Sequence, residues 1–198
     1  MNHLEITYIR YNELNQLSLR VVFHCAPLLY GLKISNILKL NHSEVPELMK
    51  MLRGTGIKVN TLYDNGYQSS FLLLYDRSGV ERYLSIQTVG NFMKDCGYMT
   101  LQIDYILSIV SQRYQNYMEG SSGFPHELGI ILGYPIDDVI GFINNKGLNS
   151  LCAGYWKVYN NVLVARQTFS QYDMAKIEAM KQVKEGLSIG DIYSKHHM

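Results

Sequence analysis

The chain has 198 residues, of which 47% are hydrophobic and 18% charged, a balance typical of one folded domain and not of a disordered protein. Eighteen lysines and arginines against 17 acidic residues leave a net charge of +1, so no bulk attraction to nucleic acid or to an anionic membrane is expected. The longest apolar runs, such as 71–75, are far shorter than the roughly 20 residues that a membrane-spanning helix needs.

The cysteines indicate a compartment. Cys25, Cys96 and Cys152 are odd in number and widely separated, and no apolar signal segment precedes them. We therefore predict free thiols in a cytoplasmic protein. The 16 tyrosines are expected at the edge of the core or along grooves, because each ring is apolar and each hydroxyl needs a partner.

The N-terminal quarter is predicted to be helical. Apolar residues at steps of three or four predict a helix over 11–25 with His24 on its inward face, and Pro27 should end it. Residues 28–40 lack a clean period and are predicted to form a turn and a short helix. Ser43 is a candidate N-cap for the next helix, which a Gly-Thr-Gly sequence ends.

A β-hairpin follows. The runs 57–63 and 70–75 are rich in β-forming residues, and Asp-Asn-Gly at 64–66 is strong turn chemistry. Because an isolated hairpin is marginally stable in water, it must lean on helices or a third strand, for which the aromatic run 155–159 is the candidate.

Most of the remaining chain has helical periodicity, and the whole of 1–198 is predicted to be a single α+β domain, mostly helical around a small antiparallel β-sheet. A Glu-Gly-Ser-Ser-Gly sequence is a predicted flexible link, and the C-terminal tail is predicted to be disordered. The predicted helices span 78–96, 101–117, 162–185 and 188–193, the link 119–123 and the tail 194–198.

Residues 124–146 predict a tight helical pair. Gly133 suits the positive φ of a helix C-terminus, and the proline after Tyr134 biases that residue away from the α region. The second helix should begin near Ile136, with two aspartates in its first turn, where carboxylates favour the helix dipole.

The helical pair resembles a DNA-binding helix-turn-helix, but its charges argue against that function. Asp137 and Asp138 lie at the end of the second helix that would meet the bases, and Lys146 is its only basic residue. The same two aspartates are predicted to be helix-start residues and not a metal-binding pair. No glycine-rich segment matches a Walker loop or a dinucleotide fingerprint.

Several short motifs are shared with a known family. They are His-Cys-Ala-Pro at 24–27, Gly-Leu-Lys at 31–33, Phe-Pro-His-Glu-Leu-Gly at 124–129, Leu-Gly-Tyr-Pro at 132–135, Asp-Val with Gly-Phe-Ile at 138–143, and Gly-Tyr-Trp-Lys-Val-Tyr at 154–159. Together they resemble a bacterial family, domain of unknown function 3793, from about residue 20 to 172. The resemblance brings no established activity, fold or ligand, and implies at most a flavodoxin-like or iron-handling partner.

His24 and Cys25 are the first chemical candidates. Adjacent helical residues point about 100° apart, so these two cannot form a nucleophile–base pair without partners from elsewhere. Cys25 lies near the C-terminus of the predicted helix, where the dipole disfavours a thiolate, although Lys33 would compensate if the chain folds back. The alternatives are a core histidine and a packed thiol.

His126 and Glu127 are the second pair. They occupy the predicted first turn of a helix, where backbone N–H groups favour anions. The pair is not a zinc-protease motif, because position 130 is Ile130. His126 is a candidate ligand or general acid–base, and Glu127 is either a catalytic carboxylate or a first-turn residue that favours the dipole.

A metal site is a further hypothesis. His24, Cys25, His126 and Cys152 are ligand types that zinc or iron accepts, although no Cys-x-x-Cys spacing supports such a site.

Two functions remain open. The first is a small-molecule or redox-linked enzyme whose pocket brings His24, Cys25 and His126 within about 10 Å, together with Lys33, Glu127 and Tyr155. The second is a non-catalytic module that binds a protein partner or senses a metal, with scattered candidates and an exposed aromatic patch. Tyr134, Tyr155 and Trp156 are the predicted binding residues.

Overall fold

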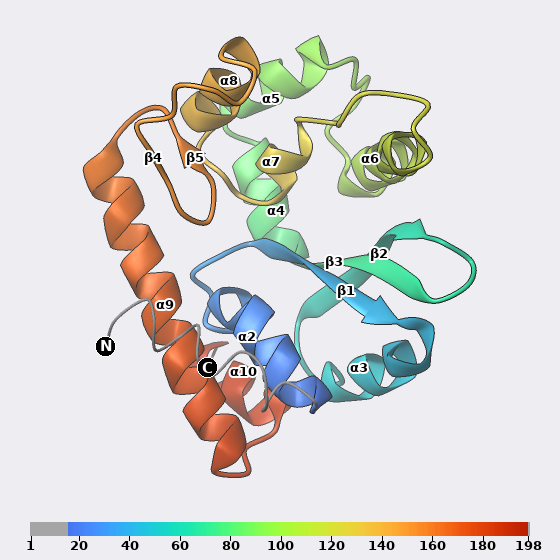
Figure 1. The fold of residues 1–198 in the computed structure, drawn as a ribbon, viewed down its shortest axis with the longest axis vertical. Helices are drawn as coiled ribbons and strands as arrows, with labels where there is room; N and C mark the ends of the chain where they lie inside the picture. The colour runs from blue at the N-terminus through green and yellow to red at the C-terminus, as the bar shows by residue number, and fades with distance from the viewer. Residues whose placement is uncertain (1–15, 198) are drawn as a thin grey trace.

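A computed structural model describes residues 16–197. A three-stranded antiparallel sheet lies between two groups of helices, one formed by the two ends of the chain and one by its middle (Figure 1). Each face of the sheet carries its own apolar core. The predicted α+β fold, mostly helical around a small antiparallel sheet, is confirmed.

The sheet consists of β1 (Ser35–Asn41), β2 (Ile57–Asp64) and β3 (Ser69–Asp76) in the order β1-β3-β2. The predicted hairpin is β2–β3. The central strand β3 is buried on both faces because successive side chains alternate: Leu72 and Leu74 enter one core, while Leu73 and Tyr75 enter the other.

The third strand comes from a region where the sequence analysis was wrong. Residues 35–41 form β1 and not a turn with a short helix, and Leu38 and Leu40 point inward with a period of two. The aromatic run 155–159 does not join this sheet. Only Lys157–Val158 is a strand, β5, which pairs with β4 (Cys152–Ala153) in a separate two-stranded sheet.

The first core lies under α2 (Leu17–Leu29), which is sandwiched between the sheet and the long helix α9 (Val162–Lys184). Because α2 is covered on most sides, nearly all of its residues are apolar. The helix does not end at Pro27 as predicted. A proline lacks only one hydrogen-bond donor, and here α2 continues two residues further.

Two shorter helices complete this side, α3 (Val45–Met51) and α10 (Ile189–His197). Ser43 is not the N-cap of α3: it lies inside a 3-10 turn, His42–Glu44, whose N-cap is Asn41 and whose last residue, Glu44, completes a capping box with it. α10 continues to His197, where a disordered tail was predicted. Residues 11–15 and 198 of the predicted elements lie outside the described residues.

The second core is covered by α4 (Arg77–Leu84), α5 (Gln87–Asp95), α6 (Ile103–Met118), α7 (Leu128–Ile131) and α8 (Ile136–Asn144). The predicted helix over 78–96 is two helices, which separate at Ser85 and Ile86. None of the helices in the described part of the chain combines the length and apolarity needed to cross a membrane.

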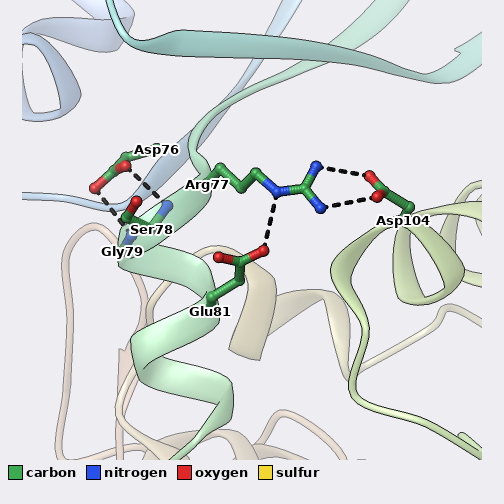
Figure 2. Close-up of polar contacts among 6 residues, drawn as sticks. All are labelled: Asp76, Arg77, Ser78, Gly79, Glu81 and Asp104. Carbon is green, nitrogen blue, oxygen red and sulfur yellow. Dashed lines mark hydrogen bonds and ion pairs between the residues drawn. The ribbon is translucent and has the colours of Figure 1, made fainter.

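The step from β3 into α4 is fixed by side chains at the start of α4 (Figure 2). Asp76 accepts hydrogen bonds from two backbone N–H groups of the first turn, at 3.1 and 3.0 Å. Arg77 donates to both oxygens of Asp104 on α6, at 2.9 and 2.8 Å, and also to Glu81. This forked contact ties α4 to α6.

Candidate functional site

Two tight turns face one another between the two cores. At the end of α2, Leu32 N–H donates to the Pro27 carbonyl at 2.8 Å and Gly31 N–H to the Leu28 carbonyl at 3.1 Å. This is the Schellman pattern, and it requires the positive φ of 67° at Gly31. The chain reverses there, so Lys33 returns toward α2.

The end of α7 repeats the pattern. Tyr134 N–H donates to the Gly129 carbonyl and Gly133 N–H to the Ile130 carbonyl, both at 2.9 Å, with φ of 75° at Gly133 as predicted. A Cβ at Gly133 would lie 2.8 Å from Ile34, so only glycine fits against the first turn. The two turns thereby place Lys33 and Tyr134 side by side, with the Lys33 Nζ 5.3 Å from the Tyr134 ring centroid.

Lys33 is the centre of a buried cluster with Asn36 and Cys25. Its Nζ donates to Asn36 Oδ1 at 2.9 Å, and Asn36 Nδ2 donates to Cys25 Sγ at 3.8 Å. The exposed fraction is 7% for Lys33 and 0% for Cys25. The chain therefore folds back and brings Lys33 near Cys25, which was the condition for the two groups to interact.

Burial shifts the pKa values of both Lys33 and Cys25 in this cluster. Loss of hydration on burial is the largest cause that lowers the pKa of the Lys33 ammonium from 10.5 to about 8. Burial likewise raises the pKa of the Cys25 thiol from 9.0 to about 12, although Lys33 and the Asn36 amide oppose the change. The resting pair is a neutral thiol beside an amine that loses its proton easily.

An open pocket lies against Tyr134, with a volume of about 180 Å³. Its walls come from the loop before α7, from α7 and α8, and from β5 with the residue before it. Most of its surface is apolar and aromatic. The lining residues used below are Phe124, His126, Tyr134, Phe142, Trp156 and Lys157, with Asp138 beneath them.

One wall is a stack of two predicted binding residues. The Tyr134 and Trp156 rings lie 5.3 Å apart with an interplanar angle of 29°, and Trp156 also meets Phe169 of α9 edge-on at 4.5 Å. Asp138 holds this wall in place: it is 5% exposed, and its Oδ2 accepts from Trp156 Nε1 at 2.7 Å.

The second oxygen of Asp138 holds the chain after β5. Its Oδ1 accepts from the backbone N–H groups of Tyr159 and Asn160, at 2.7 and 2.9 Å. Asp138 lies in the first turn of α8, as predicted, but sequence reasoning missed this second role. The signal available was a carboxylate without a nearby partner in the sequence, which does not identify donors 18 to 22 residues away.

The opposite wall carries His126. Its ring lies between Phe124 and Phe142, at centroid distances of 5.6 and 5.4 Å. Within residues 16–197 the imidazole nitrogens accept or donate no hydrogen bond. His126 precedes α7, a helix of one turn, and so does not occupy the helical position that was predicted.

Glu127 points elsewhere. It is buried and accepts from Arg113 Nη1 at 2.5 Å and from Tyr98 Oη at 3.0 Å. Arg113 also donates to the Cys96 carbonyl at 3.0 Å. Glu127 therefore ties the start of α7 to α6 and to the end of α5, and it does not line the pocket.

The remaining candidates do not converge either. His24 is exposed on α2, contrary to the predicted inward face, because its neighbours Phe23 and Cys25 occupy the buried positions. Neither His24 nor Cys25 lines the pocket. Tyr155 packs against α9, where its hydroxyl donates to Asp173 at 2.7 Å.

The three cysteines are unpaired and the metal-ligand candidates are not grouped together in the described chain. Cys25, Cys96 and Cys152 are free, as predicted. Among residues 16–197 no three His, Cys, Asp or Glu side chains are grouped so that they could hold a metal ion, so His24, Cys25, His126 and Cys152 do not form the hypothesised site.

Comparison with known proteins identifies a family and nothing more. Residues 21–193 match the model of the family described as Protein of unknown function (DUF3793), so the chain belongs to that family. No curated protein and no solved structure matches the chain.

Proposed function

We propose that this DUF3793 protein is a binding module that holds a small aromatic molecule in the pocket between α7, α8 and β5. The observation that carries the proposal is the wall composition: Phe124, Tyr134, Phe142 and Trp156 surround one open cavity, and His126 contributes polar atoms to it. Ligand sites are commonly apolar and aromatic cavities with a few polar groups that fix orientation.

The size of the pocket sets the size of the ligand. Its volume is about 180 Å³. A cavity of roughly 150 Å³ in another protein accommodates benzene. One aromatic ring with a small substituent therefore fills the pocket, whereas most of a nucleotide or a flavin would lie outside it.

His126 supports a ligand with a polar substituent. Its ring is held by contacts with Phe124 and Phe142, and its nitrogens have no hydrogen-bond partner within residues 16–197. A ring nitrogen that is positioned but unused by the protein can orient a ligand at low entropic cost.

Binding is favoured over thiol catalysis because Cys25 is outside the pocket. The thiol is fully buried, and burial raises its pKa to about 12, so little thiolate forms at neutral pH. The enzyme hypothesis requires His24, Cys25 and His126 in one cavity, and only His126 lines it.

The test is ligand binding to a matched pair of variants. Phe124 and Tyr117 are both 40% exposed and lie in one aromatic cluster, with ring centroids 5.1 Å apart, but only Phe124 lines the pocket. Saturation-transfer NMR and calorimetry with a neutral probe, benzamide, should detect binding to the wild type. We expect Phe124→Ala to weaken binding about tenfold through lost ring contact, and Tyr117→Ala to leave it unchanged.

The proposal is wrong if benzamide and related single-ring probes fail to bind the wild-type protein. It is also wrong if Tyr117→Ala reduces binding as much as Phe124→Ala does. His126→Phe adds a second measurement, because it preserves the ring contacts and removes only the hydrogen bond, and it should weaken benzamide binding severalfold.

A further inference from the structure

We infer that the pocket selects an aromatic acid, whose carboxylate is held by Lys157 and His126 while its ring lies against the aromatic walls. The inference rests on the proposed function and specifies the chemical class of its ligand. It follows from an inventory of the charges that line the cavity.

Lys157 is the cation available to a ligand. Its Nζ donates to the Gly147 carbonyl at 2.6 Å and lies 5.8 Å from the Phe142 ring centroid. Within residues 16–197 no carboxylate lies within ion-pair distance of this ammonium. An ammonium has three donors, so two remain beyond the one that Gly147 receives.

Asp138 is the only acid among the residues that line the pocket in the described chain, and both of its oxygens already accept hydrogen bonds from the protein. Its two oxygens accept three hydrogen bonds, from Trp156 Nε1 and from the N–H groups of Tyr159 and Asn160. It also lies in the first turn of α8, where the helix dipole favours a negative charge. Asp138 is therefore committed to holding the wall.

The charged groups that line the pocket also argue against a cationic ligand. Four aromatic rings around a cavity resemble the cages that bind quaternary ammonium groups through cation–π contacts. Here the Lys157 ammonium already lies near one of those rings, at Phe142. A second cation would be repelled by it, whereas a carboxylate gains an ion pair that water only partly screens in a hollow with apolar walls.

His126 provides the second donor for the carboxylate. One ring nitrogen of a neutral imidazole carries a proton and donates, and both do in the protonated form. The Phe124 and Phe142 contacts fix the plane of this ring on the same cavity that Lys157 lines. Two donors on one cavity suit the two oxygens of a carboxylate.

The experiment compares three single-ring probes that differ in charge: benzoate, benzamide and benzylammonium. Calorimetry on the full-length protein at pH 7 should give benzoate a dissociation constant about tenfold below that of benzamide, as expected for a charge-assisted contact. Benzylammonium should bind more weakly than benzamide. Raising the salt from about 50 to about 300 mM should weaken benzoate severalfold and leave benzamide unchanged.

A pair of lysine variants locates the effect. Lys157→Met keeps most of the aliphatic stem and removes the charge, so benzoate should lose its tenfold advantage over benzamide. Lys146→Met removes the same charge from an exposed position in the neighbouring loop that does not line the pocket, and it should change neither affinity.

The outcomes separate the two proposals. If benzamide binds as tightly as benzoate, or if Lys157→Met leaves the preference intact, the acid inference fails and the aromatic pocket stands. If neither probe binds, the proposed function fails and the inference fails with it. The probe comparison and the salt series need only the wild-type protein, so they decide the question even if Lys157→Met does not fold.

Discussion

Two neighbouring regions that meet at Tyr134 differ in access to solvent. On one side of this residue, Lys33 and Cys25 are buried beneath the turn that follows α2, with pKa values displaced toward the neutral forms. On the other, Trp156 stacks on Tyr134 in the wall of an open pocket that also contains His126. The first region has the shifted pKa values expected of a reactive site, and the second has space for a ligand.

The difference shows that displaced pKa values do not by themselves mark a functional site. At Lys33 and Cys25 the largest cause of both shifts is desolvation, which also denies reagents an approach. The buried cluster packs two turns together, and the pocket presents the aromatic rings that those turns support. Three predictions follow from this contrast.

The largest effect is expected for the reactivity of Cys25. A shift of its pKa from 9.0 to about 12 lowers the thiolate fraction at neutral pH roughly a thousandfold, and complete burial adds a steric barrier. Iodoacetamide at pH 7.5, followed by peptide mass spectrometry, should therefore label Cys25 at least about a thousandfold more slowly in the native protein than in denaturant. Partly exposed Cys152 should be labelled in the native state and confirms that the reagent is active.

A rapid native reaction at Cys25 would reverse the contrast. If its rate in the folded protein came within tenfold of the rate in denaturant, the thiol would be accessible. The enzyme hypothesis that includes Cys25 would then return to consideration.

The next effect concerns Asp138. Replacing it by alanine leaves Trp156 Nε1 and two backbone N–H groups without an acceptor, which should lower the free energy of unfolding by about 3 kcal/mol. Asp137→Ala is the matched control, since it removes the other first-turn carboxylate of α8, which is exposed and accepts a hydrogen bond from Asn160 Nδ2 at 3.0 Å. That change should cost under about 1 kcal/mol.

Urea denaturation with the two variants checks this prediction, and probe binding extends it. Asp138→Ala should also abolish benzamide binding, because the indole wall loses its anchor. Equal destabilisation by the two variants would mean that Asp138 contributes only helix-start chemistry and that the wall is held by packing.

The sequence predicts the local features of both regions and not their assembly. Most of the helices predicted from periodicity, the Asp-Asn-Gly turn and the glycine before Tyr134 depend on neighbouring residues, and these are confirmed. The single helix predicted over 78–96 is instead two helices. Strand β1 was missed because its alternation covers only seven residues, next to the Lys33 turn. Its strand identity is evident from its register with β3, a tertiary property.

The candidate site residues also divide into those whose contacts are local in the sequence and those whose contacts depend on the tertiary fold. The chain reversal that brings Lys33 near Cys25 needs only a glycine, Gly31, and a short separation in the sequence. The contact between His126 and Phe142 instead depends on how α7 and α8 pack, which the sequence does not show. Lys157 and Asp138 carried no recognisable motif. Their roles depend on which donors, acceptors and rings surround them in the fold.

The smallest effect is a pH dependence of stability that assigns the buried charge. The unfolded chain keeps the Lys33 proton up to about pH 10.5, whereas the folded protein releases it above about pH 8. Between those values the unfolded state binds more protons, so the free energy of unfolding should rise with pH by at most about 1.4 kcal/mol per unit. The Cys25 thiol acts oppositely above pH 9.0, because the unfolded chain ionises first.

The two opposing slopes confine the net rise to about pH 8–9, with a plateau above it until the tyrosines, whose pKa values are also raised by burial, ionise in the unfolded chain. Urea denaturation across pH 7–10 measures this profile. Lys33→Met should remove the rise and expose the decline above pH 9, whereas Cys25→Ala should extend the rise toward pH 10. A wild-type profile that is flat from pH 8 to 9 would mean that Lys33 keeps its proton through contact with water. The Lys33–Cys25 cluster would then be accessible to solvent, as the pocket is.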